Sequence, residues 1–324
     1  MKSIELSRRK NYFQSYLRVF LSNNVFILLA ILALVLIFGG IFVPNIFKLM
    51  NVINVIRVVS IVGIIAIGET FVLLTGEIDI SVGSIMSLSL VTGGLFLDLG
   101  SVPALLITCA TGLILGIING VVVAKGRVKS LIVTLGTLSI YGGLALVVSR
   151  GQAVYLYGLQ GYLWTGKGYF LGIPAPVIFF IAICVLSFIF LTFTSTGRYL
   201  YYTGANEMAA FCSGVRVDKI KILAFAIAGL CAAMAGPLFS SQTIRVTPIQ
   251  GVGFELSAIA IVVLGGTTLS GGKGTILGTL IGALTYGFLL NILSLSGIGT
   301  YMEQVLKGVL LIVIVIVFQN VRRR

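Results

Sequence analysis

Long runs of apolar residues restrict this chain to folds that cross a lipid bilayer. The first run extends from Val25 to Val43 without a polar residue. At about 1.5 Å rise per residue a helix of this length spans about 28 Å, close to the hydrocarbon thickness of a bilayer. Apolar residues make up 58% of the chain and charged residues only 10%, far from a soluble composition. The sequence therefore predicts an all-α polytopic membrane protein.

Similar runs recur along the whole chain, which we interpret as one transmembrane domain over residues 1–324. About ten spans are expected, some of them broken or re-entrant, because glycines and polar residues interrupt the pattern near the third and eighth. The predicted spans are 25–43, 53–74, 83–99, 102–124, 131–149, 176–193, 220–242, 255–269, 274–293 and 304–319.

Basic residues predict the orientation, because they collect in the cytoplasmic loops of inner-membrane proteins. With ten spans both termini lie on one side, and a cytoplasmic assignment, with 1–24 as an N-terminal cytoplasmic segment, places most of the 22 Lys and Arg inside. The net charge of +13 then reflects topology and anionic lipid headgroups. No aromatic-interleaved basic patch indicates nucleic-acid binding. We expect a bacterial cytoplasmic (inner) membrane protein.

Cofactor and catalytic signals are missing from the sequence. The chain has no histidine, no clustered nucleophile and base, and no cysteine spacing typical of a metal site. The run Gly271 to Gly274 fails as a phosphate-binding loop, because Lys273 is followed by glycine rather than Ser or Thr. We expect no catalytic residues, no metal and no bound cofactor.

A polar stretch at 194–221 interrupts the apolar pattern and contains a short capped helix. Asn206 is a good N-cap, Glu207 lies in the first turn where the helix dipole favours an anion, and Gly214 can adopt the left-handed conformation that ends a helix. About two turns remain between the caps, which is marginal for an isolated helix. The stretch is a candidate docking element.

The apolar residues of this short helix lie on one face. Met208, Phe211 and Cys212 are spaced i, i+3, i+4, the pattern of a helix seated in a groove of another protein. The alternative is a surface helix whose apolar face packs on its own membrane domain.

Charged residues close to the bilayer mark a first polar interruption, Leu73 to Ser84. Glu77 and Asp79 belong to it, Ser81 follows, and Glu69 precedes it inside a span. Carboxylates in spans normally face a bundle interior, a partner or a water-filled path. Asp79 either caps the next helix through the amides of 80–83 or contributes to a transport path.

A second polar interruption, Gly251 to Ser257, precedes a short apolar run that glycines flank on both sides. Such irregular backbone is tolerated in a bilayer only where protein or a wet cavity covers it. Glu255 and Ser257 are therefore further candidates for a path or gate.

Glycine stripes predict close helix packing. Gly112, Gly116 and Gly120 form one stripe, and Gly278 and Gly282 another. Small residues at this spacing let helix backbones approach in lipid. Packing within one bundle is the favoured interpretation, and contact with a second subunit is the alternative.

Three motifs, in this order, resemble the permease subunits of ribose-type sugar ABC importers. They are Thr75 to Ser84, Gly197 to Gly214, and Gly253 to Gly274, and the similarity runs nearly from end to end. The resemblance implies a pore formed with a second permease subunit, either a homodimer or a sister permease. It also implies a cytoplasmic ABC ATPase, which binds ATP and magnesium, and an extracytoplasmic sugar-binding protein.

The resemblance makes the capped helix a coupling helix, since Asn206, Glu207, Ala209 and Gly214 match the family's ATPase-docking loop. Two departures stand out: Glu77 occupies a position that is usually glycine, and Ser257 one that is usually aspartate. We expect Glu77 to add charge near the gate and Ser257 to replace a charged contact by a weaker neutral hydrogen bond.

A rival function is a secondary transporter or channel that uses Glu69, Glu77 or Asp79 to carry protons or sodium. This interpretation needs no partner and leaves the capped helix without a role.

Overall fold

The structure is a computed structural model that describes residues 23–321. The basic residues predicted to be cytoplasmic at 1–22 and 322–324 lie outside the described residues. The helices are α2 (Asn23–Phe42), α3 (Leu49–Leu74), α4 (Val82–Gly94), η1 (Leu97–Leu99), α5 (Ser101–Gly126), α6 (Ser130–Ser149), α7 (Gln160–Lys167), α8 (Ala175–Phe193), α9 (Ser195–Ala205), α10 (Glu207–Cys212), α11 (Val217–Thr243), α12 (Phe254–Leu264), α13 (Ile276–Leu295) and α14 (Thr300–Val321). The strands are β1 (Val154–Tyr155), β2 (Tyr169–Phe170), β3 (Ile173–Pro174) and β4 (Arg245–Val246).

Seven helices within the described part of the chain are long and apolar enough to cross a membrane: α2, α3, α5, α6, α8, α11 and α13. Each coincides with a predicted span, and α14, with 22 residues, covers the tenth. The all-α polytopic fold is therefore confirmed.

The third and eighth spans are shorter than predicted. Helix α4 has 13 residues and α12 has 11, so at about 1.5 Å per residue they reach only about 20 and 17 Å. The predicted ends at 99 and 269 are wrong, because α4 ends at Gly94 and α12 at Leu264. Gly93 lies against the start of α5, and Gly266, with φ of +85°, turns the chain out of α12.

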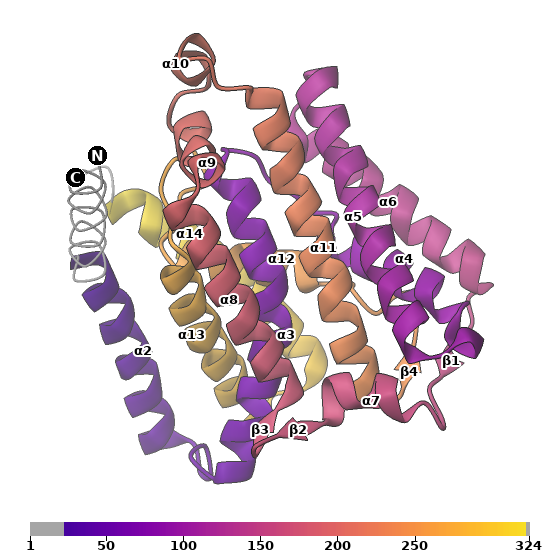
Figure 1. Ribbon diagram of the computed structural model, residues 1–324. Helices are drawn as coiled ribbons and strands as arrows, with labels where there is room; N and C mark the ends of the chain where they lie inside the picture. Colours follow the sequence, from indigo (N-terminus) through magenta and orange to yellow (C-terminus); the bar gives the residue numbers. More distant parts are fainter. Residues whose placement is uncertain (1–22, 322–324) are drawn as a thin grey trace, which may run out of the picture.

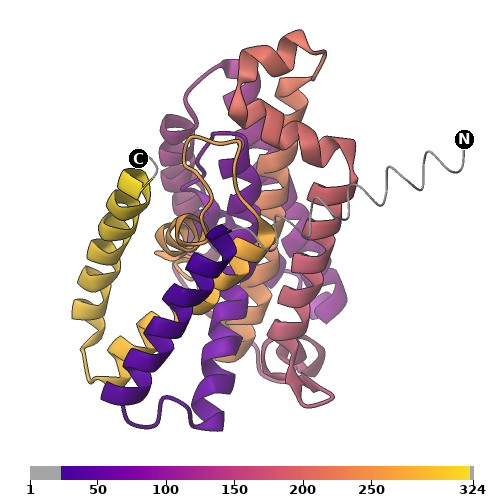
Figure 2. The same ribbon diagram turned by 90° about the vertical axis from the view of Figure 1, so that its left-hand side faces the viewer.

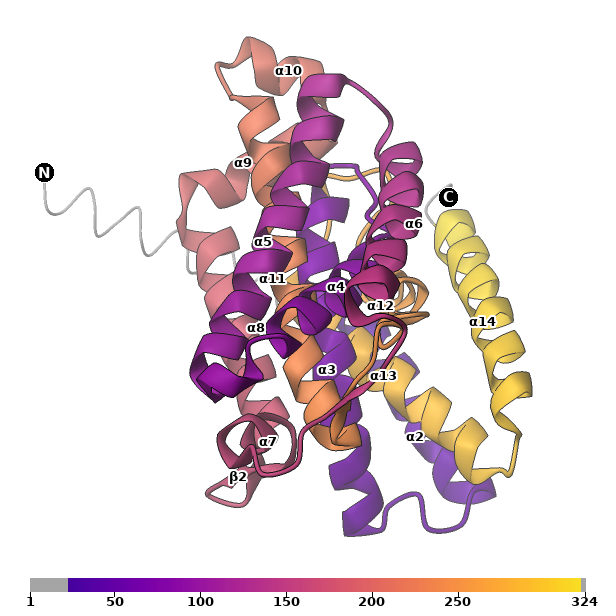
Figure 3. The ribbon, with the colours of Figure 1, turned by 90° about the vertical axis from the view of Figure 1, so that its right-hand side faces the viewer.

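Helix α11 lies at the centre of the bundle, where it packs against α5, α3, α4 and α7. Helix α10 lies at one end, and α7 with the hairpin of β2 and β3 at the opposite end (Figure 1). Strand β1 pairs antiparallel with β4. Helix α14 stands at the edge of the bundle (Figure 2), and α5 and α6 lie on the side of the bundle that faces the viewer in Figure 3.

The glycine stripes lie against helices of the same chain. A Cβ added to Gly120 of α5 would lie 2.7 Å from Ile222 Cα of α11, and one added to Gly282 of α13 would lie 2.8 Å from the backbone nitrogen of Gly265. Both distances are inside van der Waals contact, so only glycine permits these crossings. The interpretation as packing within one bundle is confirmed.

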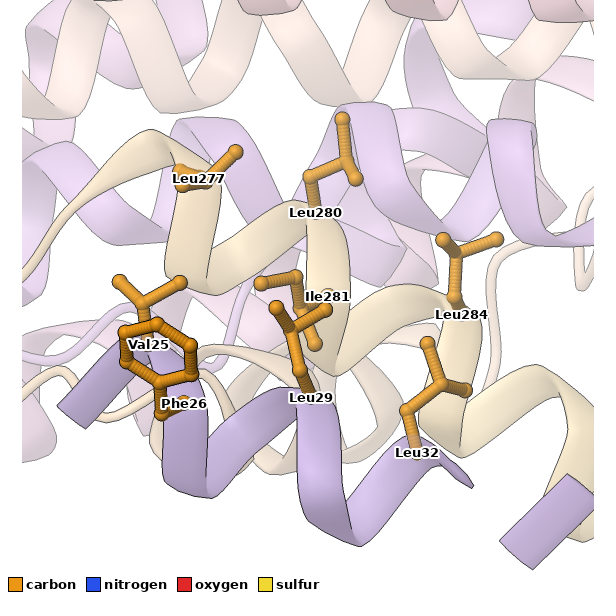
Figure 4. Close-up of a pocket in the computed structure, with 8 residues that line it drawn as sticks. All are labelled: Val25, Phe26, Leu29, Leu32, Leu277, Leu280, Ile281 and Leu284. Atoms are coloured by element: carbon orange, nitrogen blue, oxygen red, sulfur yellow. The ribbon is translucent and has the colours of Figure 1, made fainter. Parts of the chain in front are cut away.

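An apolar groove of about 300 Å³ separates α2 from α13 (Figure 4). Because the lining side chains are all hydrocarbon, they offer a sugar no hydrogen bond. The groove therefore does not match the polar path that the resemblance implies. The lining residues are Val25, Phe26, Leu29, Leu32, Leu277, Leu280, Ile281 and Leu284.

Candidate functional site

The short helix α10 begins and ends as the sequence predicts. Asn206 is its N-cap, and the Asn206 side-chain oxygen accepts a hydrogen bond from the Ala209 N–H at 2.9 Å. Gly214 has φ of +83°, the left-handed conformation that ends the helical segment. Both predicted caps are confirmed.

The apolar face of α10 is exposed. Met208 and Phe211 are 70% and 67% exposed, and Cys212 is also exposed. Within α10, Ala210 is the buried residue. The alternative in which Met208, Phe211 and Cys212 pack on the chain's own membrane domain is therefore wrong, and the face is open to a partner.

Lys221 of α11 binds two carboxylates at once. Its Nζ lies 2.8 Å from Glu207 Oε2, in the first turn of α10, and 2.8 Å from Glu77 Oε1, in the polar loop after α3. The Lys221 side chain is only 10% exposed, against 16% for Glu77 and 59% for Glu207. We call Glu77, Lys221 and Glu207 the lysine bridge.

The lysine bridge was not predicted, because Lys221 was interpreted only as one of the cytoplasmic basic residues. One sequence signal was available. Lys221 follows the first turn of a long apolar span, where a cation needs a partner. The sequence alone does not identify which carboxylates it meets.

Asp79 organises the start of α4. Its Oδ1 accepts hydrogen bonds from the Ser81 N–H at 2.8 Å and from the Ser81 hydroxyl at 2.6 Å. Asp79 thus bonds one of the expected amides, that of Ser81, but Ser81 is itself the N-cap residue of α4, so Asp79 does not cap the helix. These contacts hold the polar loop in a turn before α4 begins.

Glu69 faces the interior of the bundle, one of the locations expected for it. Its Oε1 accepts a hydrogen bond from the Asp79 N–H at 3.1 Å, and both residues are fully buried. Glu69 Oε2 and Asp79 Oδ2 have no hydrogen-bond partner among the described residues. The sequence-predicted residues Glu69, Asp79 and Ser81 are thus brought together.

Two residues that the sequence did not single out extend this contact into a chain of hydrogen bonds. Asn119 of α5 donates from Nδ2 to Ser81 Oγ at 2.7 Å, and the Tyr141 hydroxyl of α6 donates to Asn119 Oδ1 at 3.0 Å. The lone asparagine in the apolar run of α5 was the available signal. The chain of hydrogen bonds links α6, α5, the start of α4 and α3.

The second interruption lies against the first. Gly251 donates its N–H to Ser87 Oγ of α4 at 2.9 Å, and the Glu255 carboxylate lies beside Gly83 of α4. Both Glu255 oxygens also accept from the Gly253 N–H, at 3.0 and 3.1 Å. The N-terminal ends of the two short helices therefore meet inside the bundle.

Ser257 makes the neutral hydrogen bond that was expected of it. Its hydroxyl donates to the Gly253 carbonyl at 3.0 Å and accepts from the Tyr286 hydroxyl of α13 at 3.1 Å. Ser257 therefore ties α12 to a neighbouring helix. It does not contact Glu69, Asp79 or Ser81.

Comparison with known proteins agrees with this architecture. A family profile described as the branched-chain amino acid transport system / permease component matches residues 51–315. The ribose import permease protein RbsC of Bacillus subtilis (strain 168) is 41% identical over 288 residues, 88% of this chain and 89% of the relative. The corresponding protein of Escherichia coli (strain K12) is 38% identical over 295 residues, 90% of this chain and 92% of the relative.

A second kind of relative is the autoinducer 2 import system permease protein LsrC of Yersinia pseudotuberculosis serotype IB (strain PB1/+). It is 36% identical over 288 residues, 87% of this chain and 82% of the relative. No solved structure matches the chain significantly. The profile match and the full-length similarity show that this multi-pass membrane protein belongs to the family of branched-chain amino acid transport system permease components.

Proposed function

We propose that this chain is the transmembrane subunit of an ABC importer that carries a ribose-like monosaccharide or a related compound. The similarity to ribose import permeases supports a sugar rather than an amino acid. A binding protein outside the cell delivers the substrate, and a separate cytoplasmic ATPase, which holds ATP and magnesium, drives transport. This chain contributes no ATP site, and it pairs with a second permease, either an identical copy or a sister.

The exposed apolar face of α10 is the observation that carries this proposal. A helix of six residues is only marginally stable in isolation. Met208 and Phe211 nevertheless point away from the chain's own core, so an ATPase groove is the natural cover for them. The α10 end of the bundle is then cytoplasmic, in a bacterial inner membrane.

The two short helices α4 and α12 border the translocation path in this proposal. Glu69, Asp79 and Ser81 bond to one another, which supports a role in fixing the start of α4. Glu255 and Ser257 act in the same way on α12. Irregular backbone at membrane depth is stable only where such contacts cover it or where it lines a wet path.

The rival function is an ion-coupled transporter that uses Glu69, Glu77 or Asp79. Glu77 is paired with Lys221, and the other two carboxylates are fully buried, so none is an open ion site in this conformation. Adding an uncoupler to vesicles at constant ATP separates the two functions. Abolished uptake under these conditions would favour the rival.

The decisive experiment is co-purification of the full chain with candidate ATPase subunits, followed by ribose uptake in vesicles. Phe211→Asp should abolish co-elution, because it places a charge on the apolar face of α10. Leu171→Asp is the matched control, since Leu171 is 86% exposed and lies between β2 and β3, whose hairpin is at the opposite end of the bundle (Figure 1). If Phe211→Asp still co-elutes with the ATPase, α10 is not the docking element.

A further inference from the structure

The end of α9, in the polar stretch 194–221, contacts the first polar interruption and the loop after α12 through backbone atoms. A Cβ added to Gly271, in the loop after α12, would lie 2.6 Å from the Gly76 nitrogen and 2.9 Å from Gly204 Cα at the end of α9. The Gly272 N–H also donates to the Leu74 carbonyl at 3.0 Å. We call Gly76, Gly204, Gly271 and Gly272 the glycine junction. At this junction the end of α9 lies against the end of α3 and against the loop after α12.

The lysine bridge links α10, α11 and the polar loop after α3 through ion pairs. Glu207 opens α10, Lys221 is fixed in the central helix α11, and Glu77 lies two residues before Asp79. Asp79 in turn holds the start of α4 through Ser81. A displacement of α10 therefore acts on the polar loop through two charge-assisted hydrogen bonds.

The two halves of the bridge differ in how easily they open. Glu207 is 59% exposed, so water can solvate it if its bond to Lys221 breaks, whereas Glu77 is only 16% exposed. A buried cation left without any partner is strongly unfavourable. Because Glu77 remains bound, Lys221 keeps a counterion when Glu207 moves away, so the bridge can open on the α10 side alone.

We propose that Lys221 is a positioning residue that couples α10 to the polar loop and so to the start of α4. This inference rests on the proposed importer function. While the Lys221–Glu207 bond is closed, it transmits a movement of α10 to Glu77 and the loop; once it opens, α10 and the loop are no longer connected through Lys221.

A first experiment measures coupling in the complete importer reconstituted with its ATPase and binding protein. Lys221→Met keeps most of the side-chain length and removes the charge. The complex should still assemble and hydrolyse ATP, but ribose taken up per ATP should fall about tenfold, which corresponds to about 1.4 kcal/mol. Lys219→Met is the matched control, because Lys219 is exposed on the same helix, and it should keep the wild-type ratio.

Charge exchange separates positioning from packing. The triple variant Glu77→Lys, Lys221→Glu, Glu207→Lys reverses all three charges and should restore a substantial part of the lost coupling. Lys221→Met with wild-type uptake per ATP, or a triple variant no better than Lys221→Glu alone, would overturn the proposal. If Lys221→Met does not fold, Glu207→Gln tests the same bond from its exposed side.

A second experiment needs no ATPase, and so distinguishes failure of the inference from failure of the importer function. Cys212 of α10 is exposed, whereas Cys184 and Cys231 are buried, so a maleimide spin label can be placed on Cys212 in a Cys109→Ser background. Lys221→Met should increase the mobility of this label in the purified full chain, and Lys219→Met should not. Equal mobility in both variants would refute anchoring of α10 by Lys221.

Discussion

Replacing Gly120 by alanine tests whether the crossing of α5 and α11 sets the stability of the bundle. The added Cβ would lie 2.7 Å from Ile222 Cα, 3.1 Å from the Ile222 carbonyl oxygen and 3.2 Å from Phe225 Cβ, where ordinary contact begins at 3.4 Å. The helices must therefore separate by roughly 0.7 Å, and gaps of 0.5–1 Å forfeit a quarter to a half of each dispersion contact. We expect the free energy of unfolding to fall by about 1–3 kcal/mol, the usual cost of overpacking.

The assay is unfolding of the purified chain in mixed micelles by increasing SDS, followed through the single tryptophan, Trp164. Gly136→Ala is the matched control, because nothing lies within 4 Å of the added Cβ in α6. It reports helix propensity alone, which favours alanine by up to about 1 kcal/mol. Unfolding of Gly120→Ala at the same SDS fraction as Gly136→Ala would refute the steric argument.

Three further predictions concern the polar contacts. Asn206→Ala removes the cap of α10 at a cost of about 1 kcal/mol, so ATPase binding should weaken about fivefold in a titration of the purified subunits; unchanged affinity would show that α10 is held by its partner alone. Asn119→Leu removes the hydrogen bonds to Ser81 and Tyr141, while the Ser81 hydroxyl keeps Asp79 and the Tyr141 hydroxyl keeps the Leu115 carbonyl; the SDS titration should therefore show a loss of about 0.5–1.5 kcal/mol for each lost bond. Ser257→Ala and Tyr286→Phe both remove the Tyr286–Ser257 hydrogen bond, worth about 0.5–1.5 kcal/mol, and Ser257→Ala also removes the bond to the Gly253 carbonyl. The double variant should therefore be no less stable than Ser257→Ala; additive losses would contradict a shared bond.

The sequence was sufficient for features that depend on local pattern. Apolar runs located the spans, since a helix is the local way to satisfy backbone groups in lipid. Asn206 and Gly214 marked the ends of α10, because capping depends on residues within one turn. The glycine stripe of α5 indicated a close crossing, although the partner helix was not identified.

The sequence was insufficient where distant segments meet. The ends of α4 and α12 do not follow from hydropathy, and they lie in backbone contact with α5 and α13. Lys221 acquires its role from Glu77 and Glu207, which lie far from each other in the sequence but are brought to one nitrogen by the fold. The hydrogen bond between Tyr141 and Asn119 likewise forms only because the fold places α6 beside α5.

The glycine junction also sets an order for biosynthesis. Gly76 and Gly204 are both synthesised before Gly271, yet the structure joins all three through backbone contacts. While the ribosome is still adding α11 and α12, the end of α9 lacks one of the surfaces against which it packs. A nascent chain that stops before residue 271 therefore lacks the backbone contacts that this junction gives to the end of α9.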